Sequence, residues 1–141
     1  MVVLDEFPNS PNEPFTQTSH VDVGYNCIAW AASDNTRWYE PDPIGFYYWP
    51  PEVPRAYTVD AYINLYEHLG YERCWNGDLE PGYEKIAVFA HGPIPTHAAR
   101  QLNTGIWTSK LGKNIDVEHS IPAIEEGFYG NVVQYLRKQI L

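Results

Sequence analysis

A segment dense in proline and aromatic residues, from Trp38 to Tyr57 (WYEPDPIGFYYWPPEVPRAY), most constrains how this chain folds. It holds five of the twelve prolines, and proline fixes φ and removes a backbone donor. Neither a regular helix nor a central strand can therefore run through it. Its apolar content is also too high for a solvated linker. The segment predicts a packed aromatic loop, suited to lining a cleft, that separates two parts of the chain.

Two helices are expected around this loop. Asn26 is a good N-cap for a short, alanine-rich and buried helix over 27–33. Thr58 is a second good N-cap, and Gly70 is a good stop for the helix that follows. The apolar residues that recur at helical spacing between these two signals are Val59, Tyr62, Ile63, Tyr66 and Leu69. They predict a helix over 59–69.

The pattern changes to short strands after residue 70. Runs of β-branched, aromatic and other apolar residues alternate there with turn residues. The expected strands are 71–75, 85–90, 96–102 and 106–111, with a further segment at 115–119 and a helical turn at 121–126. Residues 131–137 fit a last strand or a helix, and Val132, Val133 and Tyr135 favour the strand. We therefore expect an α+β fold in which the N-terminal helix, bearing Cys27, packs on a mostly antiparallel sheet.

Length and composition indicate a single domain over residues 1–141. The hydrophobic share of 44% is enough for one core and too little for two. Residues 1–18 are expected to form an extended arm without chemistry, because three prolines stand there among Asn, Ser and Glu. The core is then expected over residues 25–137.

The charge balance bears on partners and location. Nine basic against eighteen acidic residues give a net charge of −9 without any Lys or Arg cluster, so we expect neither nucleic acid nor membrane as a partner. The first residues lack the basic start and apolar run of a signal peptide, and no stretch approaches the roughly 20 apolar residues of a membrane span. We expect a cytoplasmic protein, with export by a leaderless route left open.

Cys27 and Cys74 are the two cysteines, and their dissimilar contexts do not form a disulfide framework. A helix N-terminus with a neighbouring imidazolium is the usual way to lower a thiol pKa from about 8.5 and create a nucleophile. Cys27 has such a position, whereas Cys74, beside Trp75, is expected to be structural. Because no paired short spacing such as CxxC or HxxxH occurs, we expect no metal and no cofactor.

His97 is the expected general base for Cys27. It starts a strand after the GPIPT turn, which is a rigid position at long sequence separation. His119 is its main rival, since the remaining histidines lie in loops or at a helix end. The Asn26 side chain and the backbone N–H of Cys27 are expected to donate hydrogen bonds to an oxyanion.

The predicted hairpin limits which groups can accompany His97. Gln101 shares its face of the strand, because side chains alternate along a strand. A three-residue turn over 103–105 would place Ser109 on that face as well, whereas a two-residue turn would present Thr108. No Asp or Asn stands out as the group that would orient the imidazole.

At these residues the chain resembles a known family. The motifs YNCIAWA, THAARQ and GIWTSKLG, followed by a later His and YG, are similar to those of bacterial papain-like cysteine hydrolase domains. The resemblance covers residues 25–137 and implies a papain-like fold. It also implies Cys27 as nucleophile and His97 as base, with Ser109 and His119 at matching catalytic positions. The Asn or Asp that follows the histidine in papain has no clear match here.

Two functions fit these residues. The first is thiol-dependent hydrolysis or acyl transfer, of the peptidase or amidase type, through an acyl-enzyme on Cys27. A peptide or amide-containing substrate would then contact Trp49, Tyr48 and Gln101. The second is a catalytically inactive papain-like module, such as an immunity or adaptor protein, that holds a protein partner with its acidic, aromatic surface. Substitution of Cys27 by Ala would abolish the first function and leave the second intact.

Overall fold

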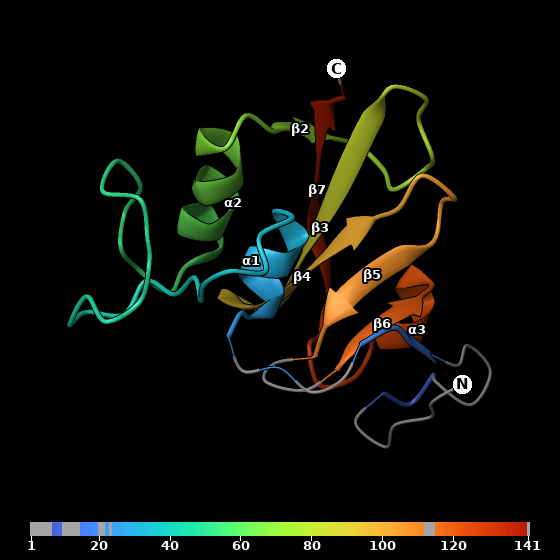
Figure 1. Cartoon of the computed structure of the whole chain (residues 1–141), viewed down its shortest axis with the longest axis horizontal. Coiled ribbons are helices and arrows are strands. Elements are labelled where there is room, and N and C mark those ends of the chain that lie inside the picture. Colours follow the sequence, from blue (N-terminus) through green and yellow to red (C-terminus); the bar gives the residue numbers. More distant parts are fainter. Residues whose placement is uncertain (1–6, 10–14, 20–21, 23, 112–114, 141) are drawn as a thin grey trace.

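An antiparallel sheet forms the centre of the molecule, and helices cover both of its faces (Figure 1). The computed structural model describes all residues except 1–6, 10–14, 20–21, 23, 112–114 and 141. Within the described residues the strands are β1 (Thr16–Gln17), β2 (Glu72–Cys74), β3 (Tyr83–His91), β4 (Ile94–Gln101), β5 (Trp107–Lys110), β6 (Asp116–His119) and β7 (Asn131–Gln139). Their order across the sheet is β1-β6-β5-β4-β3-β7-β2. The expected α+β class with a mostly antiparallel sheet is confirmed.

Both predicted helix starts are confirmed. Helix α1 (Cys27–Ala31) begins after Asn26, whose side-chain oxygen accepts a hydrogen bond from the Ala29 N–H at 3.2 Å. Helix α2 (Val59–His68) begins after Thr58, which caps it in the same way. Each helix ends earlier than predicted: α1 stops two residues before Ser33, which itself adopts a positive φ of 65°.

The predicted hairpin is formed by β4 and β5, and its turn has three residues. Leu102 donates its N–H to the Ile106 carbonyl at 2.7 Å, and the ladder continues with Gln101 opposite Trp107. The last segment is a strand, β7, as expected. A short helix, α3 (Ile121–Ile124), precedes it at the predicted helical turn.

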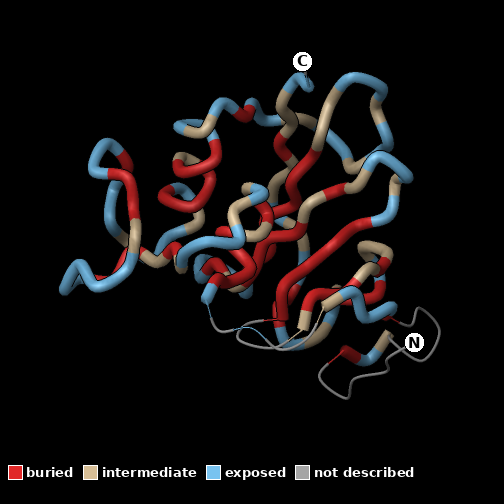
Figure 2. Tube along the Cα trace, viewed as in Figure 1, coloured by how far each residue is buried: buried red, intermediate tan, exposed pale blue. Residues whose placement is uncertain are grey.

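The sheet separates two apolar cores, because side chains alternate between its faces. We call the side covered by α1 and α2 the α1 face, and the side covered by α3 and the described N-terminal residues the α3 face (Figures 1 and 2). The α1 face buries Cys27, Ile28, Leu65, Tyr66, Ile86, Val88, Ala98 and Leu136. The α3 face buries Phe7, Phe15, Ala87, Phe89, Ala99, Trp107, Val117, Ile124 and Tyr129.

The N-terminal segment contributes to this second core. Phe15 is fully buried and Phe7 nearly so, and the two rings pack edge to face at 5.3 Å. Strand β1 pairs with β6 directly after Phe15. The core therefore begins before residue 25, and the expected arm is in contact with it at these positions. Residues 1–6 and 10–14 of that arm lie outside the described residues.

None of the helices in the described part of the chain has both the length and the apolar character needed to cross a lipid bilayer.

Candidate functional site

Three of the predicted catalytic side chains form one hydrogen-bonded line on the α3 face. The Nε2 atom of His97 lies 2.9 Å from the Ser109 hydroxyl oxygen, which in turn lies 2.6 Å from Nε2 of His119. The line follows from sheet register: the three-residue turn puts Ser109 on the face of His97, and Trp107 pairs with His119 on the neighbouring strand. Of the two turn lengths that the sequence left open, the three-residue turn is present, so Ser109 and not Thr108 shares a face with His97.

The contacts of His119, at the end of this line, determine which atom donates in each of its hydrogen bonds. Nδ1 of His119 lies 2.7 Å from the Ser120 carbonyl, which can only accept, so this nitrogen carries the proton. Neutral His119 then accepts at Nε2 from the Ser109 hydroxyl, and Ser109 accepts from Nε2–H of His97. The other nitrogen of His97, Nδ1, is buried and has no hydrogen-bond partner among the described residues.

Aromatic rings close this cluster. Tyr129 stacks on His97 with ring centroids 3.9 Å apart and an interplanar angle of 6°, and Phe15 meets the His119 ring edge-on at 5.8 Å. Burial lowers the pKa of His119 from 6.5 to about 4. Burial also holds the pKa of His97 well below its ordinary value, with the His119 charge as a second cause. Both imidazoles are therefore neutral at pH 7, and the cluster is closed to solvent.

Cys27 lies on the other side of the sheet. Its side chain packs in the core of the α1 face with Ala98, the residue that follows His97 on β4. Because adjacent strand residues point to opposite faces, the His97 imidazole points away from the thiol. The predicted pairing of Cys27 with His97 is therefore wrong.

The environment of Cys27 also opposes ionisation. Burial raises the pKa of its thiol to about 11, although hydrogen bonding to the backbone at Ala98 and Ile28 acts in the opposite direction. The thiol is protonated at neutral pH, which is the inert state of a cysteine.

Asn26, one of the two expected oxyanion donors, is held by hydrogen bonds within the fold. The Asn26 amide nitrogen donates to the Tyr39 carbonyl at 2.6 Å, and its oxygen accepts from the N–H groups of Ala29 and Tyr39. The side chain thus joins the start of α1 to the aromatic loop. The observed role of Asn26 is structural. Its predicted role in holding an oxyanion stays a prediction, because the amide nitrogen carries a second N–H.

The three expected substrate contacts do not share a site. Trp49 is buried, donates its indole N–H to the Pro54 carbonyl at 3.0 Å and packs on α2. Tyr48 lies beneath the Arg37 guanidinium at 3.6 Å. Gln101 is on the α3 face and donates to the Gly77 carbonyl at 2.7 Å. Trp49 and Tyr48 thus stabilise the aromatic loop, and Gln101 stabilises the loop around Gly77. The prediction that these three side chains contact one substrate is corrected accordingly.

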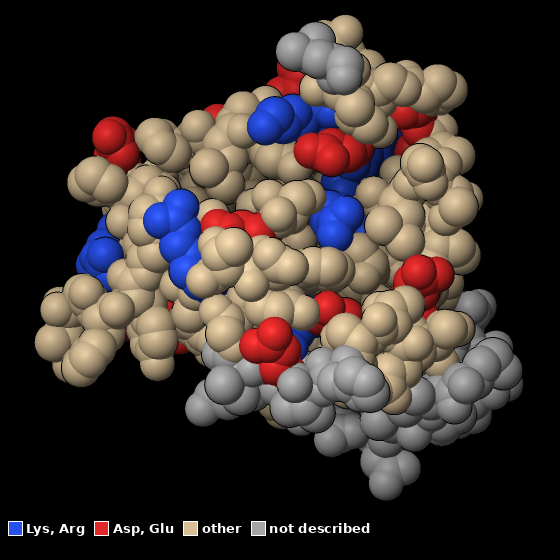
Figure 3. Space-filling view, in the orientation of Figure 1, with Lys and Arg blue, Asp and Glu red and all other residues tan. Residues whose placement is uncertain are grey.

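The aromatic loop carries a feature that sequence analysis missed. Figures 1 and 2 show the segment between α1 and α2 projecting away from the sheet, with much of it exposed. Within this loop, the Ile44 side chain is 79% exposed and the Phe46 side chain is 81% exposed. The sequence signal is Gly45 between them, which adopts a φ of +80° and turns both neighbours outward. In Figure 3 this end of the molecule is formed mainly by uncharged side chains.

Polar contacts hold this loop in one shape. The Asp42 carboxylate accepts from the N–H groups of Phe46 and Tyr47 at 2.8 and 3.1 Å and pairs with Arg55 at 3.1 Å. The Glu40 carboxylate joins the two ends of the loop, because it accepts from the Trp38 indole and from the Tyr57 hydroxyl. The exposed apolar side chains are thus presented on a fixed frame.

The described residues contain no group of three or more His, Cys, Asp or Glu side chains arranged to hold a metal ion. The fold and these sites define an α+β protein with a closed His–Ser–His cluster on one sheet face, a buried thiol on the other and a projecting aromatic loop. Residues 16–137 match the family described as a domain of unknown function, DUF7689, and the chain belongs to that family. The search of curated proteins and the search of solved structures returned no match.

Proposed function

We propose that this chain is a catalytically inactive interaction module that binds a protein partner through Ile44 and Phe46. Nearly complete exposure of these two side chains on a fixed loop is the observation that carries the proposal. A large apolar side chain held ready in one conformation loses little entropy on binding, and such residues dominate binding energies. The net charge of −9 favours a partner whose apolar cleft is surrounded by basic side chains.

A thiol-dependent hydrolase or acyltransferase of the peptidase or amidase type is the second candidate. One observation favours it: Cys27 is the first residue of a helix, with backbone donors at Ala98 and Ile28 close to its sulfur. This candidate requires a base other than His97 and a rearrangement that exposes the thiol. We also propose a papain-like relationship, supported by the order of a cysteine-bearing helix ahead of an antiparallel sheet.

Site-specific photocrosslinking tests the first candidate. A photoreactive amino acid is placed at position 46 of the full chain in its own cells. Position 94 is the control, because Ile94 is exposed at the start of β4, outside the aromatic loop. We expect one partner to crosslink from position 46 alone. The purified partner should then bind the wild type and Cys27→Ala equally, and bind the Ile44→Ser/Phe46→Ser double variant about tenfold or more weakly. Equal crosslinking from both positions would refute the proposal.

Thiol labelling separates the two candidates. In the folded protein at neutral pH, iodoacetamide should modify the half-buried Cys74 before the buried Cys27. Stoichiometric modification of Cys27 with Cys74 untouched would instead favour the hydrolase.

A further inference from the structure

Strand β7 has an outer edge that is only half covered. Its neighbour β2 pairs with Arg137, Leu136 and Tyr135, and then ends at Cys74. The remaining stretch of β7, Asn131–Gln134, pairs with β3 on its inner side and with no strand on its outer side in the described part of the chain. Unpaired backbone groups along such an edge are a template for another strand.

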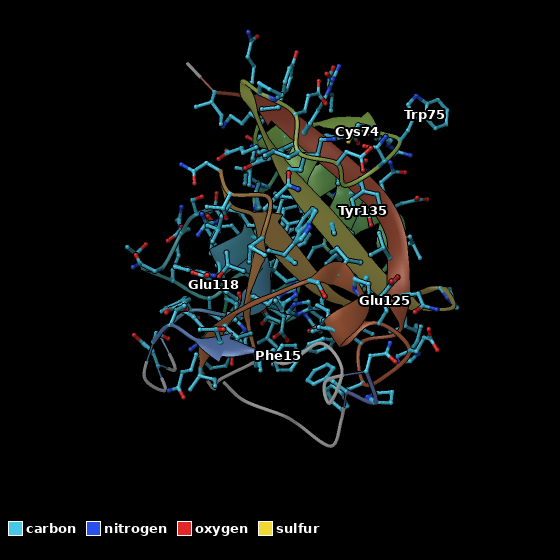
Figure 4. The ribbon with its side chains drawn as sticks, turned by 90° about the vertical axis from the view of Figure 1, so that its right-hand side faces the viewer. Phe15, Cys74, Trp75, Glu118, Glu125 and Tyr135 are labelled. Atoms are coloured by element: carbon cyan, nitrogen blue, oxygen red, sulfur yellow. The ribbon has the colours of Figure 1, made fainter. Side chains whose placement is uncertain are left out.

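Side chains take the place of the missing strand along this stretch. The Glu125 carboxylate accepts the Val132 N–H at 3.3 Å, in the way a neighbouring strand's carbonyl would. The Gln134 amide donates to the Cys74 carbonyl at 3.2 Å, where β2 stops. Figure 4 shows Cys74, Tyr135 and Glu125 following one another along β7. The Gln134 amide nitrogen also donates to the Tyr135 carbonyl at 2.8 Å, whereas the Glu125 contact is a single hydrogen bond that an incoming backbone can replace.

A cavity lies beside the same stretch. It measures about 310 Å³ and is lined by Cys74, Trp75, Val132, Val133, Gln134 and Tyr135. Trp75 is 98% exposed and projects from the molecule where β2 ends (Figure 4). An indole that packs on nothing in the free protein gains its full burial only when something fills the cavity beneath it.

We propose that Asn131–Gln134 binds an extended peptide segment of another protein as an added strand, with one apolar side chain of the peptide in this cavity under Trp75. Backbone pairing supplies affinity in this mode, and the cavity supplies selectivity. The recessed stretch spans about four residues, or roughly 13 Å at 3.3 Å per residue, which fits a short peptide strand. A second copy fits poorly, because two equally recessed edges cannot reach each other past β2.

Peptide selection against the full chain tests this proposal. A displayed library of random decapeptides is panned, and the strongest binder is synthesised with a fluorescent label for anisotropy measurements. We expect an apolar or aromatic residue to be enriched at one position. Trp75→Ala should weaken binding about tenfold or more, without risk to folding, since the side chain makes no packing contact. Ile106→Ala, which truncates another exposed apolar side chain next to the turn between β4 and β5, should leave binding unchanged.

Two readouts distinguish strand addition from mere adhesion to an apolar surface. N-methylation of the peptide backbone should abolish binding at every second residue and be tolerated at the residues between, because alternate N–H groups face the partner strand. Glu125→Ala should tighten binding severalfold, because it removes the acceptor that competes for the Val132 N–H. Failure to select a binder, unchanged affinity of Trp75→Ala, or a dimer of the chain that Trp75→Ala dissociates would overturn the proposal.

Discussion

The two faces of the sheet bury polar groups in opposite ways. On the α3 face, His97, Ser109 and His119 exchange hydrogen bonds in one line. On the α1 face, the Cys27 thiol lies in an apolar core and keeps its proton. Consecutive residues of one strand, His97 and Ala98, separate the two environments. Side chains alternate between the two faces of a strand, so His97 and Cys27 are buried in separate cores. Both residues are of types suited to catalysis, but each is enclosed and has a structural role.

Truncation of Phe15 should produce the largest effect, because this ring closes the α3 face over His119. Phe15→Ala removes a fully buried side chain and should lower the free energy of unfolding by about 3–5 kcal/mol. It should also raise the His119 pKa toward 6.5, since burial is the first cause of the lowered value. Denaturant unfolding and NMR titration measure the two quantities. The matched control Phe46→Ala, exposed on the loop, should change stability by less than about 0.5 kcal/mol.

Acid should destabilise the α3 face next most strongly. The folded pKa of His119, about 4, lies below its ordinary value of 6.5, so the unfolded chain binds more protons between these pH values. Stability is therefore full above about pH 6.5 and falls as pH drops toward 4, by about 3 kcal/mol from His119 alone at about 1.4 kcal/mol per pKa unit. His119→Gln should flatten this part of the stability curve. An unchanged slope would show that His119 is not buried as neutral imidazole.

The sequence predicted those features of the two faces that depend on interactions between residues close together in the chain. Asn26 capped α1 as expected, and the three-residue turn put Ser109 beside His97. Which face of the sheet α1 covers was not predictable, because it depends on long-range packing. Helix α1 packs against the face that carries Ala98, so His97, the residue before it, points to the opposite face. Cys27 and His97 stand 70 residues apart, and no local pattern between them indicates the face on which each side chain lies.

The remaining parts of the site escaped prediction for a different reason. Exposure of Phe46 depends on how the aromatic loop folds back on itself through Asp42, and burial of Trp49 depends on its packing against α2. Both residues stand in the same apolar run. Composition identifies such a run as aromatic, but only the loop's tertiary contacts decide which of its rings face solvent.

Adjacent residues on β5 allow the two faces to be compared directly. Ser109→Ala should cost about 1–3 kcal/mol, because it leaves both buried imidazoles without their shared partner. Thr108→Val, on the α1 face, removes only the acceptor for the half-buried Trp30 indole and should cost about 1 kcal/mol or less. Urea unfolding of both variants measures the difference. Equal costs would mean that the His–Ser–His line contributes no more than an isolated hydrogen bond.

The smallest effect should come from Cys27, and the order of two substitutions there reveals its role. Cys27→Ala removes one buried sulfur and should cost about 1 kcal/mol. Cys27→Ser keeps the size but buries a hydroxyl in an apolar core, so it should cost more than alanine, by about 1 kcal/mol or more. Thermal or urea unfolding at pH 7 gives both values. If serine proved the better substitute, the site would be polar enough to stabilise a thiolate, and Cys27 would belong with the hydrogen-bonded groups of the α3 face.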